Sequence, residues 1–282
     1  MIQGKGVYIM KKKAIFLDLD GTLLNDRKEI TPGNRSAIEQ ALSAGHLIII
    51  TSGRPLVSTA PQADALGLNR PGCYVIACNG SVFFDNAKKE VISSETLPLS
   101  VVQAVFAEAE KRGIHIQTYD EAKVLVEPRC ATDNVKEYCR RIKMEWGIID
   151  NIRNLNREPE KMLAIDFQRR EPLDHFCEWI SDHHGDILDT YYSNAHYVEI
   201  VKKGINKGEA ILRMAELLGV PREDTISAGD AQNDIFMIRS AHLGAAMANA
   251  DPEVKAAADY ITQHDNNHDG IAEILEKYVL QA

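Results

Sequence analysis

The feature that most constrains the fold is a short apolar run that ends in two aspartates. The run covers residues 14–17, and Asp18-Leu19-Asp20-Gly21 follows it directly. A continuous apolar run of this length is typical of a strand buried on both faces, as at the centre of a parallel sheet. Open parallel sheets bind ligands at the carboxyl ends of their strands. Buried carboxylates without compensation are costly, so the two aspartates must either face solvent or have a partner. Taken alone, the stretch therefore leaves two alternatives, a solvated Asp-Gly turn and a metal-binding nucleophile site.

Further apolar runs follow the first one and end in similar turns. A helix is predicted from Pro32, and the next apolar run, His46–Thr51, leads into Ser52-Gly53-Arg54. A third run, Tyr74–Cys78, leads into Asn79-Gly80-Ser81. A strand, a helix and a strand in this order form a βαβ unit. Three buried strands that each end in a polar, glycine-containing turn predict one ligand site at the carboxyl edge of a parallel sheet.

The pattern changes in the middle of the chain and then returns. Residues 84–189 contain short strands and helices in mixed order, which predicts an independent α+β module. A short strand at 198–201, a helix that begins at Lys207 and a buried strand that ends at Asp230 restore the alternation. We therefore predict an α/β core with a Rossmann-like parallel sheet, formed by residues 1–83 and 190–282. The predicted insertion at 84–189 is an α+β cap domain.

Composition excludes several classes of function. The chain has 282 residues and a net charge of −9, which argues against a nucleic-acid-binding surface. No apolar run approaches the roughly 18 residues that span a membrane. The five cysteines include no C-x-x-C pair, which favours free thiols in a reducing cytoplasm. We expect a cytoplasmic protein in which residues 1–9 are an extension before an alternative start at Met10, without the apolar segment of a signal peptide.

The polar residues at the strand ends and helix starts form a set suited to phosphate chemistry. The carboxylates of Asp18, Asp20 and Asp230 can hold a hard divalent cation such as Mg²⁺, which prefers oxygen ligands. The Ser52-Gly53 turn offers a hydroxyl and backbone N–H groups to phosphate oxygens. Lys207 adds a positive charge at a helix N-terminus, where the helix dipole already favours anions. Asp18 could then attack phosphorus, with the metal and the lysine offsetting the repulsion between the two anions.

Five motifs carry a resemblance to a known family. They are Asp18-Leu-Asp-Gly-Thr-Leu-Leu, Thr51-Ser-Gly-Arg, Asn79-Gly-Ser, Lys207-Gly and Gly229-Asp-Ala-Gln-Asn-Asp. In this order, and over nearly the whole chain, they resemble the haloacid dehalogenase (HAD) superfamily of aspartate-nucleophile phosphatases. The particular resemblance is to the Cof-type phosphatases, which have a C2-type α/β cap. The family pattern aligns the hydroxyl of the second motif with Ser52 and not with Thr51.

The resemblance assigns roles to individual residues. It implies that Asp18 is the nucleophile and a Mg²⁺ ligand, and that Asp230 is a second ligand. Asp20 would be the general acid and then the general base, with its backbone carbonyl on the metal. The residues expected to hold the phosphoryl oxygens are Leu19 through its N–H, Ser52, Gly53, Lys207 and Asn233. Asp234 is expected to orient Lys207 or a metal-bound water, and Arg54 and Asn79 to contact the substrate or to fix the surrounding loops.

The expected activity is Mg²⁺-dependent hydrolysis of a small phosphomonoester, such as a sugar phosphate, through an aspartyl-phosphate. Two alternatives remain open from the sequence: a sugar phosphomutase on the same scaffold, and a phosphate-ligand sensor without catalysis. The sensor is disfavoured because a protein that only binds has no need of Asp20 as an acid. The expected partner is a phosphorylated metabolite, without nucleic acid or membrane, and the protein is expected to be a monomer or a weak dimer.

Overall fold

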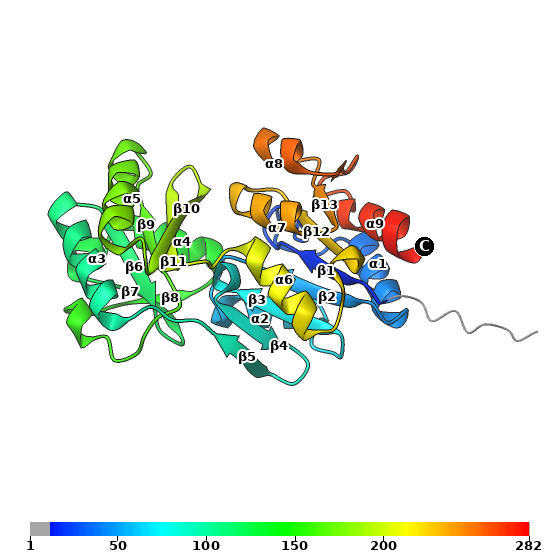
Figure 1. Ribbon diagram of the computed structural model, residues 1–282, viewed down its shortest axis with the longest axis horizontal. Helices are drawn as coiled ribbons and strands as arrows, with labels where there is room; N and C mark the ends of the chain where they lie inside the picture. Colours follow the sequence, from blue (N-terminus) through cyan, green and yellow to red (C-terminus); the bar gives the residue numbers. More distant parts are fainter. Residues whose placement is uncertain (1–11, 282) are drawn as a thin grey trace, which may run out of the picture.

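The computed structural model describes residues 12–281, and the strands within that range form two sheets (Figure 1). The predicted extension at residues 1–9 and the start at Met10 lie outside the described residues. The first sheet has the order β14-β13-β12-β1-β2-β3-β4-β5. Its strands are β1 (Ala14–Leu17), β2 (Leu47–Thr51), β3 (Cys73–Ala77), β4 (Val82–Asp85), β5 (Glu90–Ser94), β12 (Thr225–Gly229), β13 (Leu243–Ala246) and β14 (Tyr260–Ile261).

β1 is the central parallel strand that the sequence predicts. It pairs in parallel with β12 on one side and with β2 on the other. Its side chains alternate between two apolar clusters, with Ile15 and Leu17 in one and Ala14 and Phe16 in the other. The strand is therefore covered on both faces, which confirms the α/β class. The helices around this sheet are α1 (Pro32–Ser43), α2 (Leu56–Ala65), α6 (Lys207–Leu217), α7 (Ile235–Ser240), α8 (Pro252–Ala257) and α9 (Gly270–Leu275).

The second sheet forms its own layered unit, which lies at the left of Figure 1. Its strand order is β10-β11-β9-β6-β7-β8, and we call residues 99–202 the second-sheet unit. Helices α3 and α5 pack on one face of this sheet, and α4 packs on the other. The elements are α3 (Leu99–Arg112), β6 (His115–Tyr119), β7 (Lys123–Val126), α4 (Asp133–Ile142), β8 (Glu145–Ile148), β9 (Met162–Ile165), α5 (Glu171–His184), β10 (Leu188–Asn194) and β11 (Tyr197–Lys202).

Strand pairing divides the chain at positions other than the expected boundaries of 83/84 and 189/190. The hairpin of β4 and β5 pairs antiparallel to β3 and so extends the first sheet to Ser94. The strand predicted at 198–201 belongs to β11, which pairs antiparallel with β10 and β9 in the second sheet. The sequence pattern of an apolar strand is the same in either sheet, so the pattern does not show which sheet the strand joins. Only the pairing partner in the structure decides it.

Among the α-helices and strands within residues 12–281, two were not predicted from the sequence. The first is helix α2, which contains Pro61 in its interior. Because proline usually ends a helix, the sequence pattern there does not indicate one. The other is β8, a four-residue strand with only partly buried or exposed side chains, at the edge of the second sheet. None of the helices within residues 12–281 is long and apolar enough to cross a membrane.

The second-sheet unit contacts the first sheet close to the carboxyl ends of its strands. The Ser58 hydroxyl of α2 donates to the Ile142 carbonyl at the end of α4, at 2.7 Å. On the opposite side, the Tyr191 ring of β10 meets the Phe236 ring of α7 edge to face, with ring centroids 5.9 Å apart. These contacts place the second-sheet unit over the edge where the sequence predicts the ligand site.

Candidate active site

Strand β1 carries two carboxylates to the edge of the first sheet. The backbone N–H of Asp18 donates to the Ala228 carbonyl of β12 at 3.1 Å, which extends the parallel ladder as far as the first aspartate. Gly21 then turns the chain with a φ of +82°, and a Cβ atom there would lie 2.3 Å from a carboxylate oxygen of Asp230. Glycine is therefore required both for the turn and for the close approach of the two acidic strand ends.

A lysine joins the acids in one buried cluster. Lys207 Nζ donates to Asp18 Oδ1 and to Asp234 Oδ1, at 2.6 Å each. Lys207 is the first residue of α6, because the Asn206 side chain caps this helix by accepting from the N–H groups of Gly208 and Glu209. The side chains of Lys207 and Asp234 are fully buried, so their attraction is weakly screened by solvent.

Three carboxylates of this cluster lie close enough to share a cation. Oxygen atoms of Asp18, Asp230 and Asp234 lie within 4.8 Å of one another. Burial raises the pKa of both Asp18 and Asp230, and neighbouring carboxylates raise both pKa values further, against the lowering effect of Lys207. A single lysine therefore does not balance three acids. A hard divalent cation such as Mg²⁺ fits this all-oxygen donor set and would favour the ionised carboxylates.

Asp234 differs from the other two acids because both of its oxygens are engaged. Oδ1 accepts from Lys207, and Oδ2 accepts from the N–H groups of Asp230 and Ala231 at 3.0 Å each. Asp230 in turn accepts from the Thr22 hydroxyl at 2.7 Å through one oxygen. Asp234 is thus placed to orient the lysine and the turn after β12, as the resemblance implies, and its role in the reaction stays a prediction.

Asp20 is held by a different pair of cations. Arg54 contacts its two oxygens through Nε and Nη2, at 2.7 and 2.6 Å, and Lys28 Nζ contacts Oδ1 at 2.6 Å. Burial acts to raise the pKa of Asp20, but Arg54 and Lys28 together hold that pKa below its usual value. In this arrangement the carboxyl is ionised, which is the form that a general base requires. Donating a proton first requires its separation from these cations.

The turn after β2 packs closely against the turn after β3. A Cβ atom at Gly53 would lie 2.9 Å from Asn79 Oδ1, so a glycine is needed for the two turns to meet. Asn79 has a φ of +57°, and its Oδ1 accepts from Asn233 Nδ2 at 3.1 Å. Its Nδ2 is buried and has no hydrogen-bond partner among the described residues. A phosphoryl oxygen bound at this turn would satisfy that donor.

The structure brings the sequence-predicted residues to one edge of the sheet, in two adjoining groups. The acidic group contains Asp18, Lys207, Asp230 and Asp234, and the second contains Ser52, Gly53, Asn79 and Asn233, with Asp20 and Arg54 paired beside it. The side chain of Leu19 lies in the apolar core, so its N–H is the part available for the predicted contact. The hydroxyl of Ser52 accepts from the backbone N–H of Arg54 at 3.2 Å.

Several described residues that touch this site are not among the predicted ones, and three of them contact it through side chains that bear on its charge or shape. Thr22 lies inside the Asp-Gly-Thr motif, so its contact with Asp230 had a signal in the sequence. Lys28 follows the motif in a polar turn and gave no signal for its bond to Asp20. Lys161 donates to the Gly53 carbonyl at 2.8 Å, across 108 residues of chain. No local pattern marks a contact made over such a distance.

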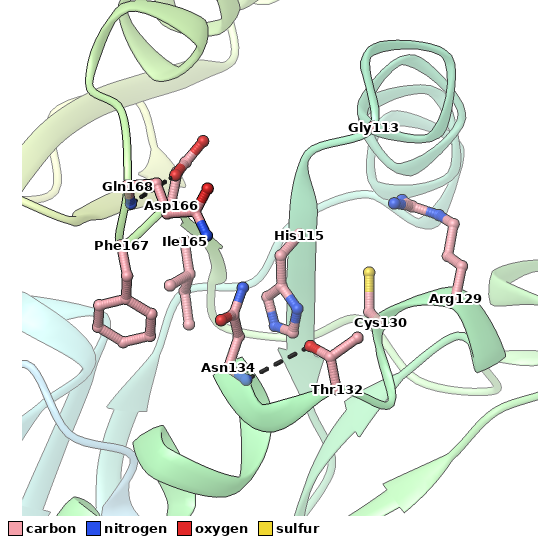
Figure 2. A pocket seen from close by; sticks show the side chains of 10 residues that line it. All are labelled: Gly113, His115, Arg129, Cys130, Thr132, Asn134, Ile165, Asp166, Phe167 and Gln168. Atoms are coloured by element: carbon pink, nitrogen blue, oxygen red, sulfur yellow. Dashed lines mark hydrogen bonds between the residues drawn. The ribbon is translucent and has the colours of Figure 1, made fainter.

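A separate polar cavity lies at the far end of the second sheet, and none of the predicted site residues lines it (Figure 2). Its volume is about 290 Å³, and it opens where β6 begins and β9 ends, beside the N-terminus of α4. His115 lies in its wall and contacts Gln117 through Nε2 at 3.3 Å. Gln117 donates its amide N–H to the Tyr119 hydroxyl, so its oxygen accepts from His115. Burial lowers the pKa of His115 to about 4.

This buried histidine predicts a loss of stability in mild acid. The pKa of His115 is lowered from 6.5 to about 4 in the folded chain, so below pH 6.5 the unfolded chain binds more protons. The free energy of unfolding should therefore fall by about 2 kcal/mol more between pH 7 and 5 in the wild type than in His115→Gln. Urea unfolding of both proteins at both pH values measures the difference. Equal pH dependence in the two proteins would contradict a buried neutral histidine.

Comparison with known proteins extends these observations to the whole chain. Residues 15–275 match the haloacid dehalogenase-like hydrolase family. The chain is 31% identical to the 5-amino-6-(5-phospho-D-ribitylamino)uracil phosphatase YcsE of Bacillus subtilis, over 95% of this chain and 96% of that protein. It is 29% identical to the pyridoxal phosphate phosphatase YbhA of Escherichia coli, over 96% of this chain and all of that protein.

A solved structure supports the same relationship. The HAD subclass IIB sugar phosphatase BT4131 superposes with a TM-score of 0.79 at 27% identity, covering 95% of this chain and 99% of that one. The family match spans the motifs at Asp18, Ser52, Lys207 and Asp230, which the fold brings to one edge. The chain therefore belongs to the haloacid dehalogenase-like hydrolase family, as a phosphomonoester hydrolase of the Cof type.

Proposed function

We propose that the protein is a Mg²⁺-dependent phosphatase that hydrolyses small phosphomonoesters through an aspartyl-phosphate on Asp18. The observation that carries the proposal is the buried cluster in which Lys207 bridges Asp18 and Asp234 beside Asp230. Mg²⁺ held by Asp18, Asp230 and the Asp20 carbonyl would neutralise charge on the phosphoryl group. A cation at this point and the fixed Nζ of Lys207 together lower the repulsion that an attacking carboxylate would meet.

The residues around Asp18 have distinct tasks in this proposal. Ser52, Gly53 and Asn233 hold the phosphoryl oxygens, and Asn79 Nδ2, which has no partner within residues 12–281, adds a donor from the neighbouring turn. Asp20 gives a proton to the leaving oxygen and later removes one from the attacking water. Arg54 and Lys28 pair with the Asp20 carboxylate in this structure, so Asp20 must leave these cations and take up a proton before it can protonate the leaving oxygen.

We infer that the second-sheet unit is the cap that covers the reacting groups. Its contacts with α2 and α7 support this role, because they lie on both sides of the carboxyl edge of the first sheet. A cover of this kind excludes bulk water and favours substrates small enough to be enclosed. The names of the relatives give pyridoxal phosphate, a phosphoribitylamino pyrimidine and sugar phosphates as their substrates. These names support small phosphorylated metabolites as the substrate class.

Removal of divalent cations tests the metal in this proposal. Treatment with EDTA should lower phosphomonoester hydrolysis by at least about 100-fold, because the stabilisation that a bound cation gives to the transition state is several kcal/mol. Added Mg²⁺ should restore the rate. It should also raise the thermal midpoint of the metal-free protein, because the ion binds the folded chain preferentially. Undiminished activity in EDTA, with no midpoint shift on adding Mg²⁺, would be evidence against the metal site.

A substrate panel tests the activity itself. Hydrolysis of sugar phosphates, pyridoxal 5′-phosphate and p-nitrophenyl phosphate is followed by release of inorganic phosphate. A hexose phosphate also separates the alternatives, since a phosphomutase forms the isomeric hexose phosphate without releasing phosphate. Release of phosphate from at least one member of the panel is the expected result. Binding of the phosphomonoesters without turnover of any of them would favour the sensor.

A further inference from the structure

A buried lysine of the second-sheet unit reaches the turn that is proposed to hold phosphate. Lys161 directly precedes β9, and its Nζ donates to the Gly53 carbonyl at 2.8 Å. Its side chain is 1% exposed. The contact joins the two sheets of the molecule at the turn that follows β2, next to Ser52. The cation is therefore directed at the predicted binding site from the side of the cap.

Lys161 Nζ has further partners besides the Gly53 carbonyl. A second N–H donates to Glu199 Oε2 of β11 at 2.8 Å. Nζ also lies over the Tyr119 ring, 5.1 Å from its centroid. That ring is itself fixed, because its hydroxyl shares a hydrogen bond of 2.7 Å with the hydroxyl of Tyr138. The two hydrogen bonds and the adjacent ring together confine this buried ammonium.

Glu199 keeps this lysine charged. Burial acts to lower the pKa of Lys161, but Glu199, together with Tyr138 and Cys78, raises that pKa above its usual value. Glu199 is itself buried, and its second oxygen accepts from the Ser193 hydroxyl at 2.9 Å. The pair is thus a compensated ion pair inside the second-sheet unit. One of its donors is left to point out of that unit toward Gly53.

The Gly53 carbonyl belongs to a peptide group that connects several proposed site residues. The N–H of the same peptide group belongs to Arg54 and donates to the Ser52 hydroxyl at 3.2 Å. The Arg54 side chain leaves the backbone at the same point and holds Asp20. A bond from Lys161 to this peptide group therefore limits its rotation. The positions of Ser52, of the Gly53 backbone and of Arg54 all depend on that peptide plane.

We infer that Lys161 is a positioning residue for the phosphate-binding turn, which it reaches from the second-sheet unit. The inference rests on the proposed function, because it assigns a task to the Ser52-Gly53 turn within that function. Lys161 acts through the peptide group of Gly53 and needs no contact with the substrate. Since every substrate presents the same phosphoryl group to this turn, its effect should be common to all phosphomonoesters. The position of the second-sheet unit on the first sheet is thereby coupled to the geometry of the phosphate-binding turn.

The test compares two variants with a matched control. Lys161→Met removes the donor but leaves Glu199 buried and unpaired, which can unfold the chain. The double variant Lys161→Met/Glu199→Gln removes both charges and so avoids that penalty. The control is Lys202→Met, which removes a lysine that pairs with Glu95 at 2.7 Å outside the proposed site. Thermal midpoints and the inhibition of Mg²⁺-dependent p-nitrophenyl phosphate hydrolysis by inorganic phosphate are measured for each protein.

The double variant should remain folded and bind phosphate more weakly. Loss of a hydrogen bond from a charged donor should raise the inhibition constant of phosphate at least about tenfold. The value of kcat/KM should fall at least as far for every substrate. The Mg²⁺ concentration for half activation should not change, because the acids around Lys207 are not disturbed. Lys202→Met should match the wild type in all three measurements.

The possible outcomes distinguish a failure of this inference from a failure of the proposed phosphatase function. A folded double variant with the inhibition constant and kcat/KM of the wild type would overturn the inference while leaving the phosphatase intact. A loss confined to one substrate would also overturn it, because that result would assign Lys161 to the leaving group. A wild type without phosphatase activity would instead overturn the proposed function, and the inference with it.

Discussion

Asp18→Asn is expected to abolish phosphomonoester hydrolysis while the chain keeps its fold. An amide is a poor nucleophile at phosphorus, so the aspartyl-phosphate cannot form. Loss of a nucleophile in other hydrolases lowers kcat on the order of 10⁴-fold or more, and a similar loss is expected here. The fold should survive because Lys207 keeps its bond to Asp234 at 2.6 Å. One buried acid whose pKa is already raised by burial is also removed from the cluster.

The measurement pairs activity with binding. Steady-state hydrolysis of p-nitrophenyl phosphate and a thermal midpoint are recorded for Asp18→Asn and for the wild type. A phosphomonoester that raises the midpoint of the variant without being hydrolysed would show that the site still binds. Activity within a few-fold of the wild type in a folded variant would assign the nucleophile elsewhere.

Asp20→Asn is expected to lower kcat by about 10²–10⁴-fold, the range that general acid–base catalysis supplies. The loss should depend on the leaving group. An alkyl phosphate needs a proton on its leaving oxygen, whereas p-nitrophenolate leaves without one. The loss in rate of phosphoryl transfer should therefore be larger for a sugar phosphate than for p-nitrophenyl phosphate. An equal loss for both substrates would argue against Asp20 as the acid.

Lys28→Met is the matched control for Asp20, because Lys28 touches the same carboxylate but stands outside the reacting groups. The pair is partly exposed, with both side chains at 36%, and such pairs contribute little to stability. We expect at most a modest change in kcat and an unchanged fold. Since Lys28 and Arg54 both hold the pKa of Asp20 down, and the first step needs Asp20 in its protonated form, the variant should move the upper limb of the pH profile of kcat/KM toward higher pH.

Most of the secondary structure that builds the site could be predicted from the sequence. The apolar run of β1, the Asn206 cap of α6 and the buried strand before Asp230 are local patterns, and the structure contains each of them. Period, capping and turn chemistry act within a few residues, so they are visible in one stretch of chain. Helix α2 was missed for the same reason, because Pro61 breaks the local pattern.

The contacts that make the site chemically distinct depend on distant parts of the chain. The carboxylates of Asp18 and Asp20 are two residues apart, yet one meets Lys207 and the other meets Arg54 and Lys28. Lys207 offsets part of the rise that burial gives to the pKa of Asp18, whereas Arg54 and Lys28 hold the pKa of Asp20 below its usual value. No sequence spacing predicts this division, because it follows from which strand ends and turns the fold brings together.

The sequence by itself determined the parallel α/β core, the edge at which the proposed site lies and the residue types that meet there. The tertiary structure alone decided that the hairpin of β4 and β5 stays with the first sheet and that β11 joins the second. It also decided that Lys161 reaches Gly53 from the other sheet. The physical reason is that strand pairing and buried ion pairs are settled by the free energy of the whole packed chain, whereas apolar periodicity and capping are settled by near neighbours.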